Sequence, residues 1–219
     1  MTASHSESYR EKEHAYFGAA RSEVLPLVPL GLERVLEIGC GAGGTLELLR
    51  GAGRCRTTYG VELVPSIAAE ARTRVDQVYV GNIEELDLPL EPGSMDAILC
   101  LDVFEHMVDP WSAMVKLTTL LAPGGLLIAS IPNVQNYRVI WPLLKGRWDY
   151  ASEGLLDRTH LRFFTRSSAV ELMQCSGLRV DRVDVTGIFG RTLRAMNMVP
   201  ILRPFLGFQF LIRARKGGS

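Results

Sequence analysis

A short glycine-rich stretch after a buried strand is the part of this sequence best suited to binding a ligand. Residues 37–44 are EIGCGAGG, with three glycines at GxGxxG spacing. Glycines at this spacing let the chain turn tightly off a strand and bring the backbone close to a ligand. By itself the pattern is weak, because many nucleotide-binding folds share it. It predicts a ligand close to the backbone of the loop that contains Gly39, Cys40, Gly41 and Gly43, directly after Glu37. We expect Cys40 to be a small buried residue rather than a nucleophile.

Two acidic residues narrow the choice of ligand. Glu37 ends the strand before the glycines, and Glu62 ends the next strand. Glu62 suits a ribose, because a carboxylate can accept hydrogen bonds from both the 2′ and 3′ hydroxyls. Glu37 would repel a pyrophosphate but would attract an ammonium group. S-adenosylmethionine has an ammonium, a sulfonium and a ribose but no phosphate, so it accounts for both acids better than a nicotinamide dinucleotide does.

The composition predicts one globular domain with a packed core. The chain has 219 residues, of which 47% are hydrophobic and 22% charged, close to the average of soluble proteins. Its formal net charge is zero, which argues against a protein that coats nucleic acid. The four cysteines are scattered, which is typical of free thiols in a reducing compartment. The polar N-terminus and the lack of long apolar runs lead us to expect a cytoplasmic protein.

The hydrophobic pattern alternates between strands and helices through the middle of the chain. Strands are expected at residues 35–38, 57–63, 77–80, 96–102 and 126–131, with helices at 45–50, 65–74 and 110–120. A helix at 167–175 then precedes two strands, at 179–185 and 208–213, which we expect to form an antiparallel pair joined by a short loop. This order predicts a Rossmann-like doubly wound α/β fold with helices on both faces of a mostly parallel seven-stranded sheet and one antiparallel edge strand.

Two segments fall outside this alternation within the single expected domain of residues 1–219. Residues 1–30 are expected to form a helical cap, 31–133 the cofactor-binding core, 134–165 a substrate-lid insertion, and 166–219 a C-terminal helix and antiparallel strands. Long insertions in compact domains are usually lids or binding loops. Residues 138–148, RVIWPLLKGRW, favour a hydrophobic lid packed on the sheet and leave open a peripheral contact with a membrane or a lipid-like substrate.

Five motifs, in this order, resemble those of class I S-adenosylmethionine-dependent methyltransferases. They are VLEIGCGAGG, YGVEL, VGNIEEL, SMDAILCLDVFEHMVDP and LAPGGLLIASIPN, which together span most of residues 30–133. A further stretch, DRTHLRFFT at residues 157–165, resembles a subgroup of small bacterial enzymes. These are related to the ubiquinone-biosynthesis O-methyltransferases and to methyltransferases encoded among cell-surface polysaccharide and natural-product genes.

The resemblance implies a role for individual residues. Glu37 and the glycine loop would surround the methionine part of the cofactor, and Glu62 would hold the ribose. The adenine would lie near Leu63, Asn82 and Ile83, and Leu101 would line the floor near the sulfonium. Asn82 departs from the commoner aspartate, although its amide oxygen can still accept a hydrogen bond from the adenine amino group. Tyr16 is a candidate to close the cofactor site from the N-terminal segment.

Candidate residues for the methyl acceptor follow the fourth and fifth strands. His106 lies just beyond the fourth strand and is either a general base or a structural histidine. His160 is a second candidate base. Asn133 and Tyr137 follow the fifth strand, where polar groups can orient a substrate, although Asn133 after a proline can also simply form a turn.

The expected reaction is methyl transfer from S-adenosylmethionine to a small molecule, with S-adenosylhomocysteine as the product. An oxygen on a sugar, a phenol or a lipid-linked intermediate is favoured as the acceptor. Nucleic acid is not expected, because residues 102–105 are DVFE instead of the Asn/Asp-Pro-Pro-aromatic run of amino-methylating enzymes. No metal is expected, because no group of potential ligands is close in sequence. An NAD-dependent oxidoreductase and a non-catalytic cofactor-binding protein remain alternatives, and the oligomeric state is open.

Overall fold

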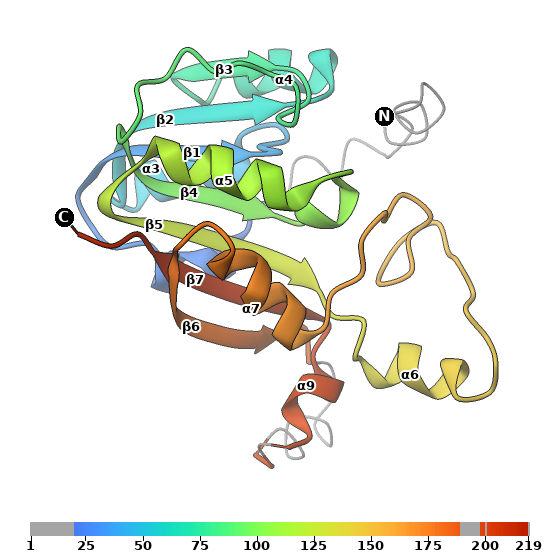
Figure 1. Ribbon diagram of the computed structural model, residues 1–219. Coiled ribbons are helices and arrows are strands. Elements are labelled where there is room, and N and C mark those ends of the chain that lie inside the picture. Colours follow the sequence, from blue (N-terminus) through green and yellow to red (C-terminus); the bar gives the residue numbers. More distant parts are fainter. Residues whose placement is uncertain (1–19, 189–197, 200, 219) are drawn as a thin grey trace.

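A seven-stranded sheet organises the part of the chain that the structure describes (Figure 1). This computed structural model describes residues 20–188, 198–199 and 201–218. The strand order is β3-β2-β1-β4-β5-β7-β6. The strands are β1 (Leu32–Ile38), β2 (Cys55–Glu62), β3 (Gln77–Val80), β4 (Met95–Leu101), β5 (Leu121–Pro132), β6 (Arg179–Thr186) and β7 (Gln209–Arg215).

Helices cover both faces of the sheet and complete a three-layered α/β fold (Figure 1). The 3-10 helices are η1 (Ser22–Leu27) and η2 (Phe104–His106), and the α-helices are α3 (Gly44–Gly51), α4 (Pro65–Ala71), α5 (Pro110–Leu120), α6 (Tyr137–Leu143), α7 (Arg166–Gln174) and α9 (Arg203–Leu206). One core cluster packs α5 and α7 on the sheet, and a second packs η1 and α3 on its other face. The predicted Rossmann-like fold is confirmed.

The antiparallel strand lies one place in from the edge of the sheet. β7 pairs antiparallel with both β5 and β6, so β6, at the edge, runs in the direction of the parallel strands. The predicted antiparallel pair of residues 179–185 and 208–213 is therefore present. The short loop expected between them is wrong, because residues 187–208 connect the two strands and include α9.

Local sequence signals explain where the main helices start. The Asp109 side chain accepts a hydrogen bond from the backbone N–H of Ser112 at 3.1 Å and so caps α5, which begins with Pro110. Thr165 and Ser168 form a reciprocal capping box at the start of α7. These caps direct both helices back along the sheet and leave the loops before them at its carboxyl edge.

Of the two segments outside the alternation, the structure describes part of the N-terminal one and all of the insertion. Of the expected N-terminal helical cap, the structure describes residues 20–30, which contain η1, and Tyr16 lies outside the described residues. In the insertion, α6 buries only Val139, while Trp141 is 63% and Leu144 74% exposed. The preference for a hydrophobic lid packed on the sheet is therefore wrong for α6, which projects from the sheet (Figure 1). Within the described residues, no helix has the length and apolar character needed to cross a membrane.

Candidate cofactor and acceptor site

The site is built where three parallel strands end side by side. In the register of the sheet, Glu37 of β1 lies between Gly60 of β2 and Leu99 of β4. The loops that follow these strands therefore meet at one edge of the sheet, which is where doubly wound folds bind their ligands. This register brings the glycine loop, Glu62 and the segment after Leu101 together.

The glycine loop is fastened to the end of β2 by its own backbone. The amides of Gly39 and Cys40 donate to the carbonyl of Val61 at 2.8 and 3.1 Å, and the amide of Gly41 donates to Glu62 Oε2 at 3.0 Å. A phosphate-binding loop offers its amides to the anion, whereas these three amides are already bonded within the protein. This arrangement favours a cofactor without phosphates over a dinucleotide.

Two side-chain positions in and beside the loop need small residues. At Gly43, which precedes α3 with φ +83°, an added Cβ would lie 2.6 Å from Val75 Cγ2. At Gly60, an added Cβ would lie 2.6 Å from Cys40 Sγ. Cys40 is itself buried, and burial raises the pKa of its thiol. A buried thiol that stays protonated is a poor nucleophile, so Cys40 fits the structural role expected from the sequence.

Glu62 is a buried carboxylate that holds two parts of the backbone together. Its side chain is 2% exposed, with Oε2 bonded to the Gly41 amide and Oε1 to the Val64 amide at 2.9 Å. Burial raises the pKa of this carboxyl, and hydrogen bonds from the Val64, Gly41 and Leu63 amides oppose the shift. A carboxylate has about four acceptor positions, so these amides leave capacity for a ribose hydroxyl.

Glu37 has a buried oxygen that the surrounding protein does not satisfy. Its side chain is 3% exposed, and among the described residues Oε2 has no hydrogen-bond partner. Desolvation raises the pKa of this carboxyl from 4.5 to about 8, while the charge of Arg21 and a hydrogen bond from Thr45 pull the pKa down. Such an orphaned acceptor costs free energy unless a ligand donates to it. It fits the ammonium group of an amino acid.

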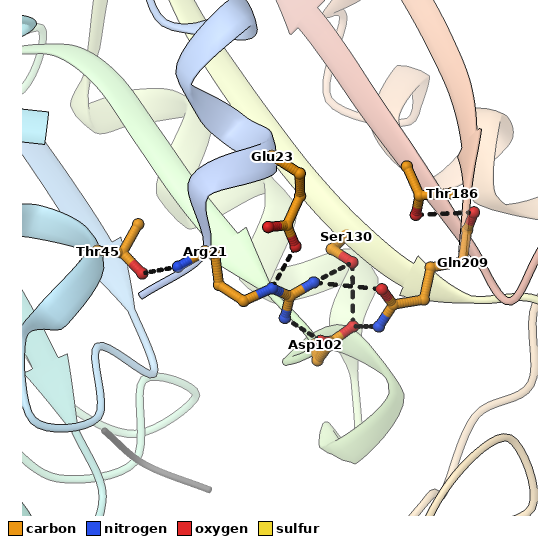
Figure 2. A network of polar contacts seen from close by, with 7 residues as sticks. All are labelled: Arg21, Glu23, Thr45, Asp102, Ser130, Thr186 and Gln209. Atoms are coloured by element: carbon orange, nitrogen blue, oxygen red, sulfur yellow. Dashed lines mark hydrogen bonds and ion pairs between the residues drawn. The ribbon is translucent and has the colours of Figure 1, made fainter. Parts of the chain in front are cut away.

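A polar network beside Glu37 was not predicted from the sequence. Figure 2 shows the guanidinium of Arg21 directed at Asp102, Ser130 and Gln209, and the structure gives an ion pair with Asp102 and hydrogen bonds of 3.2 Å with the other two. Asp102, with φ +57°, also accepts from Gln209 Nε2 at 2.7 Å. The network joins the segment before η1 to the ends of β4, β5 and β7. Arginine before a short helix carries no motif, so the sequence offered no signal for it.

Two of the three residues expected near adenine, Asn82 and Ile83, lie in one turn after β3, and Leu63 directly follows β2. Asn82 Oδ1 accepts a hydrogen bond from the Glu84 amide at 3.1 Å, and Ile83 is buried. Lys116 of α5 holds this turn by donating to the carbonyls of Ile83 and Leu86 at 2.9 and 2.6 Å. Leu63 is half-buried at the end of β2. Leu101, at the end of β4, is 7% exposed.

His106 and His160 are close together although 53 residues separate them in sequence. Their ring centroids are 4.9 Å apart in an edge-to-face arrangement. His106 is the last residue of η2, and the neighbouring Glu105 is 1% exposed. The backbone carbonyl of Glu105 accepts from the amides of Leu161 and Arg162 at 2.7 and 3.0 Å. The structure therefore brings both candidate bases to one place after β4.

The two residues predicted to orient a substrate are placed differently from each other. Asn133 is fully buried, and its amide nitrogen donates to the carbonyls of Pro204 and Gly207 at 2.6 and 2.9 Å. Its oxygen accepts from the Gln135 amide at 2.9 Å. These bonds give Asn133 a structural part, tying the end of β5 to the region of α9, so it is not retained as a substrate ligand. Tyr137 begins α6 and is 39% exposed, so its contact with substrate stays a prediction.

Comparison with known proteins agrees with this geometry. The family model described as "Methyltransferase domain" matches residues 9–183. The chain belongs to this methyltransferase family. It is 32% identical to the ubiquinone biosynthesis O-methyltransferase of Acinetobacter baumannii over 69% of each chain, and 30% identical to that of Ralstonia nicotianae over 75% of this chain and 73% of the relative. A crystal structure of a SAM dependent methyltransferase from Archaeoglobus fulgidus matches with a TM-score of 0.69 and 18% identity, covering 96% of this chain and 97% of that one.

This methyltransferase is thus a class I enzyme that uses S-adenosylmethionine, as the motifs predicted. The low identity to the archaeal structure makes that likeness one of fold alone. In the observed register, the glycine loop, Glu62 and the end of β4 lie at the same edge of the sheet. The positions of individual cofactor atoms remain predictions.

The shifted pKa of Glu37 predicts how stability depends on pH in the cofactor-free methyltransferase. The unfolded carboxyl loses its proton near pH 4.5 and the folded one near pH 8, so the folded chain binds more protons between these values. The free energy of unfolding should therefore fall as pH rises from 5 to 8, by on the order of 2–4 kcal/mol. Urea unfolding across this range measures the effect. In Glu37→Gln the fall should be largely absent, while the exposed Glu91→Gln should behave as wild type; parallel curves for Glu37→Gln and wild type would refute the assignment.

Proposed function

We propose that this methyltransferase transfers the methyl group of S-adenosylmethionine to an oxygen of a small molecule such as a phenol, a sugar or a lipid-linked intermediate. The observation that carries the cofactor part is the buried Oε2 of Glu37, which has no partner among the described residues and lies beside a loop whose amides are already bonded. The oxygen acceptor is supported by relatives of 30–32% identity that are named O-methyltransferases.

The cofactor would lie across the ends of β1, β2 and β4. Its ammonium would bind Glu37 and, by its positive charge, return that carboxyl to the ionised form. Arg21, whose charge already acts on Glu37, would attract the cofactor carboxylate. Glu62 would accept from the ribose hydroxyls, and the adenine would lie between Leu63 and the turn that contains Ile83.

The acceptor would approach from the side of His106 and His160. Methyl transfer is a displacement in line with the carbon–sulfur bond, so much of its acceleration comes from holding acceptor and methyl group aligned. Leu101 ends β4 just before the segment that carries His106, which would place the imidazoles near the sulfonium end of the cofactor. A hydroxyl acceptor must lose a proton, and imidazole is suited to handle it near neutral pH.

The net charge bears on the class of methyl acceptor, and the cysteines bear on the cellular compartment. Zero net charge supports a small-molecule acceptor over nucleic acid. All four cysteines are unpaired, which supports a reducing compartment such as the cytoplasm.

The position of the ribose can be tested with Glu62→Ala. Losing hydrogen bonds to a charged group should weaken S-adenosylhomocysteine binding by about 1–3 kcal/mol, or roughly 5- to 150-fold in Kd. Isothermal titration measures the change, with NADH as the control ligand and the exposed Glu91→Ala as the matched variant. Because Glu62 also holds the Gly41 and Val64 amides, circular dichroism must show a folded variant. Unchanged affinity in a folded Glu62→Ala protein would remove Glu62 from the ribose site.

The acceptor class can be tested with paired substrates. Phenols, catechols and sugars are compared with anilines and aliphatic amines of the same carbon skeleton, and formation of S-adenosylhomocysteine is measured for each pair. We expect turnover of one or more hydroxyl compounds and at least tenfold slower turnover of the matched amine. Preferential methylation of the amines would contradict an oxygen acceptor.

We also propose that α6 and the residues after it contact an anionic membrane surface, from which a lipid-like acceptor would be reached. Trp141 and Leu144 are 63% and 74% exposed and lie next to Leu143, which is 45% exposed, so exposed apolar side chains are contiguous along this segment. Arg138, Lys145 and Arg147 accompany them, and Lys145 Nζ lies 4.9 Å from the centre of the Trp141 ring. Exposed aromatic and aliphatic side chains with basic neighbours are typical of helices that lie on a membrane.

Cosedimentation with vesicles tests this contact. Binding should be seen with phosphatidylglycerol vesicles, should be weaker with phosphatidylcholine vesicles, and should decline as salt is added. The double variant Trp141→Ser/Leu144→Ser should lose at least about tenfold in partitioning, since it removes two large apolar groups. Leu30→Ser is the control, because Leu30 is also 68% exposed but precedes β1, at the opposite edge of the sheet. Equal binding by both variants would contradict the proposal.

A further inference from the structure

Two histidines and a glutamate form a compact buried group beyond the end of β4. Glu105 is 1%, His106 7% and His160 9% exposed. Each offers one potential ligand atom, and these three atoms all lie within 4.8 Å of one another. Ligand atoms of one tetrahedral ion, at bond distances of about 2.0–2.2 Å, lie roughly 3.5 Å apart. Small side-chain rotations would therefore bring these three donors onto a single ion. The expectation of no metal depended on spacing along the chain, and these three residues come together only in the fold.

Both imidazoles are oriented in the way that metal ligands usually are. His106 Nδ1 lies 3.0 Å from the carbonyl oxygen of Thr159, and His160 Nδ1 lies 3.2 Å from that of Leu155. A carbonyl oxygen only accepts hydrogen bonds, so Nδ1 carries the proton in each ring. A neutral imidazole of this tautomer has its lone pair on Nε2, the atom that binds a metal. Metal-binding histidines commonly donate their other N–H to a backbone carbonyl or a carboxylate.

The backbone holds the two ligand-bearing segments together independently of any ion. The amides of Leu161 and Arg162, in the insertion, donate to the carbonyl of Glu105 at 2.7 and 3.0 Å. Asp157 Oδ1 accepts from the backbone and the hydroxyl of Thr159 at 2.8 and 2.7 Å, which fixes the carbonyl that orients His106. The distance between the two histidines is therefore set by the fold, as a preorganised site requires.

We propose that Glu105, His106 and His160 bind one divalent transition-metal ion of the zinc type. Two imidazole nitrogens and one carboxylate oxygen suit Zn²⁺ or Co²⁺, whereas Mg²⁺ and Ca²⁺ prefer sites built from oxygen. Three protein ligands leave an open position on the ion, as in catalytic zinc sites. Asp102, next to β4, is occupied by Arg21 and is not part of the set.

The part that this ion would play rests on the proposed function. Bound at the open position, the acceptor hydroxyl would have its pKa lowered and would release its proton to solvent. The oxygen would then form a bond with the methyl carbon, while the carbon–sulfur bond breaks and its electron pair stays on sulfur as S-adenosylhomocysteine. In this arrangement His106 and His160 are ligands rather than general bases.

Metal binding can be measured without any acceptor. The full-length protein, purified without a polyhistidine tag and treated with a chelator, is titrated with Co²⁺ by visible absorption and with Zn²⁺ by calorimetry. We expect one ion per chain, with cobalt absorption in the visible range that Zn²⁺ displaces. His160→Ala and Glu105→Gln should each weaken metal binding at least about a hundredfold. Loss of a residue that only orients a metal ligand costs about 10- to 100-fold. Glu91→Gln, at an exposed glutamate that is not one of the three ligands, should bind as wild type does.

Binding of S-adenosylhomocysteine separates the two proposals and reports on folding. If wild-type protein binds S-adenosylhomocysteine but takes up neither ion with a Kd below about 10 µM, the metal site is refuted and the proposed function stands. If His160→Ala binds both S-adenosylhomocysteine and Zn²⁺ as wild type does, the ligand assignment is likewise refuted. Loss of zinc together with unchanged S-adenosylhomocysteine binding in His160→Ala supports the site.

Discussion

The parallel register of β1 between β2 and β4 is the constraint on which the site depends. It sets Glu37 beside Gly60 and Leu99, so that the chain leaves all three strands at the same edge. A shift of one residue would turn Glu37 toward the opposite face and would separate the glycine loop from the Val61 carbonyl. The buried apolar residues on both faces of β4 make such a shift costly, since each would have to leave its core cluster. Packing far from the ligand therefore fixes the geometry at the ligand.

Around this edge the protein holds buried charge that its own groups only partly balance. Glu62 is stabilised by backbone amides, and Arg21 by Asp102, whereas Glu37 is left with one unsatisfied oxygen. Burying an unpaired carboxylate costs several kcal/mol, so the free protein keeps Glu37 protonated near neutral pH. A ligand with an ammonium group removes that cost. This buried carboxyl therefore favours a ligand with an ammonium group over a dinucleotide.

The sequence predicted what depends on short-range patterns. The glycine loop, the acids at the ends of β1 and β2, and all seven strands were found within a few residues of their places, because each leaves a local signature. The Arg21 network, the link of Asn133 to Pro204, and the meeting of His106 with His160 were not predicted. Each of these joins residues from separate parts of the chain, and no local pattern encodes such a distance. The packing of α6 was wrong because an apolar run does not reveal whether protein or another surface covers it.

The insertion links these observations, because it approaches the strand ends on one side and carries α6 on the other. Its residues 159–162 are bonded to the segment after β4, whereas Trp141 and Leu144 remain exposed. The proposed membrane contact at α6 and the proposed acceptor group at His160 thus lie on the same inserted segment. The insertion also supplies His160 of the proposed metal site. A substitution that loosens the insertion would therefore change the proposed metal site and the proposed membrane contact together. Glu37 and Glu62, at the ends of β1 and β2, would stay in place. The proposed cofactor site thus depends on the register of the sheet, whereas the proposed acceptor site also needs the insertion, which sets His160 beside His106 of the segment after β4.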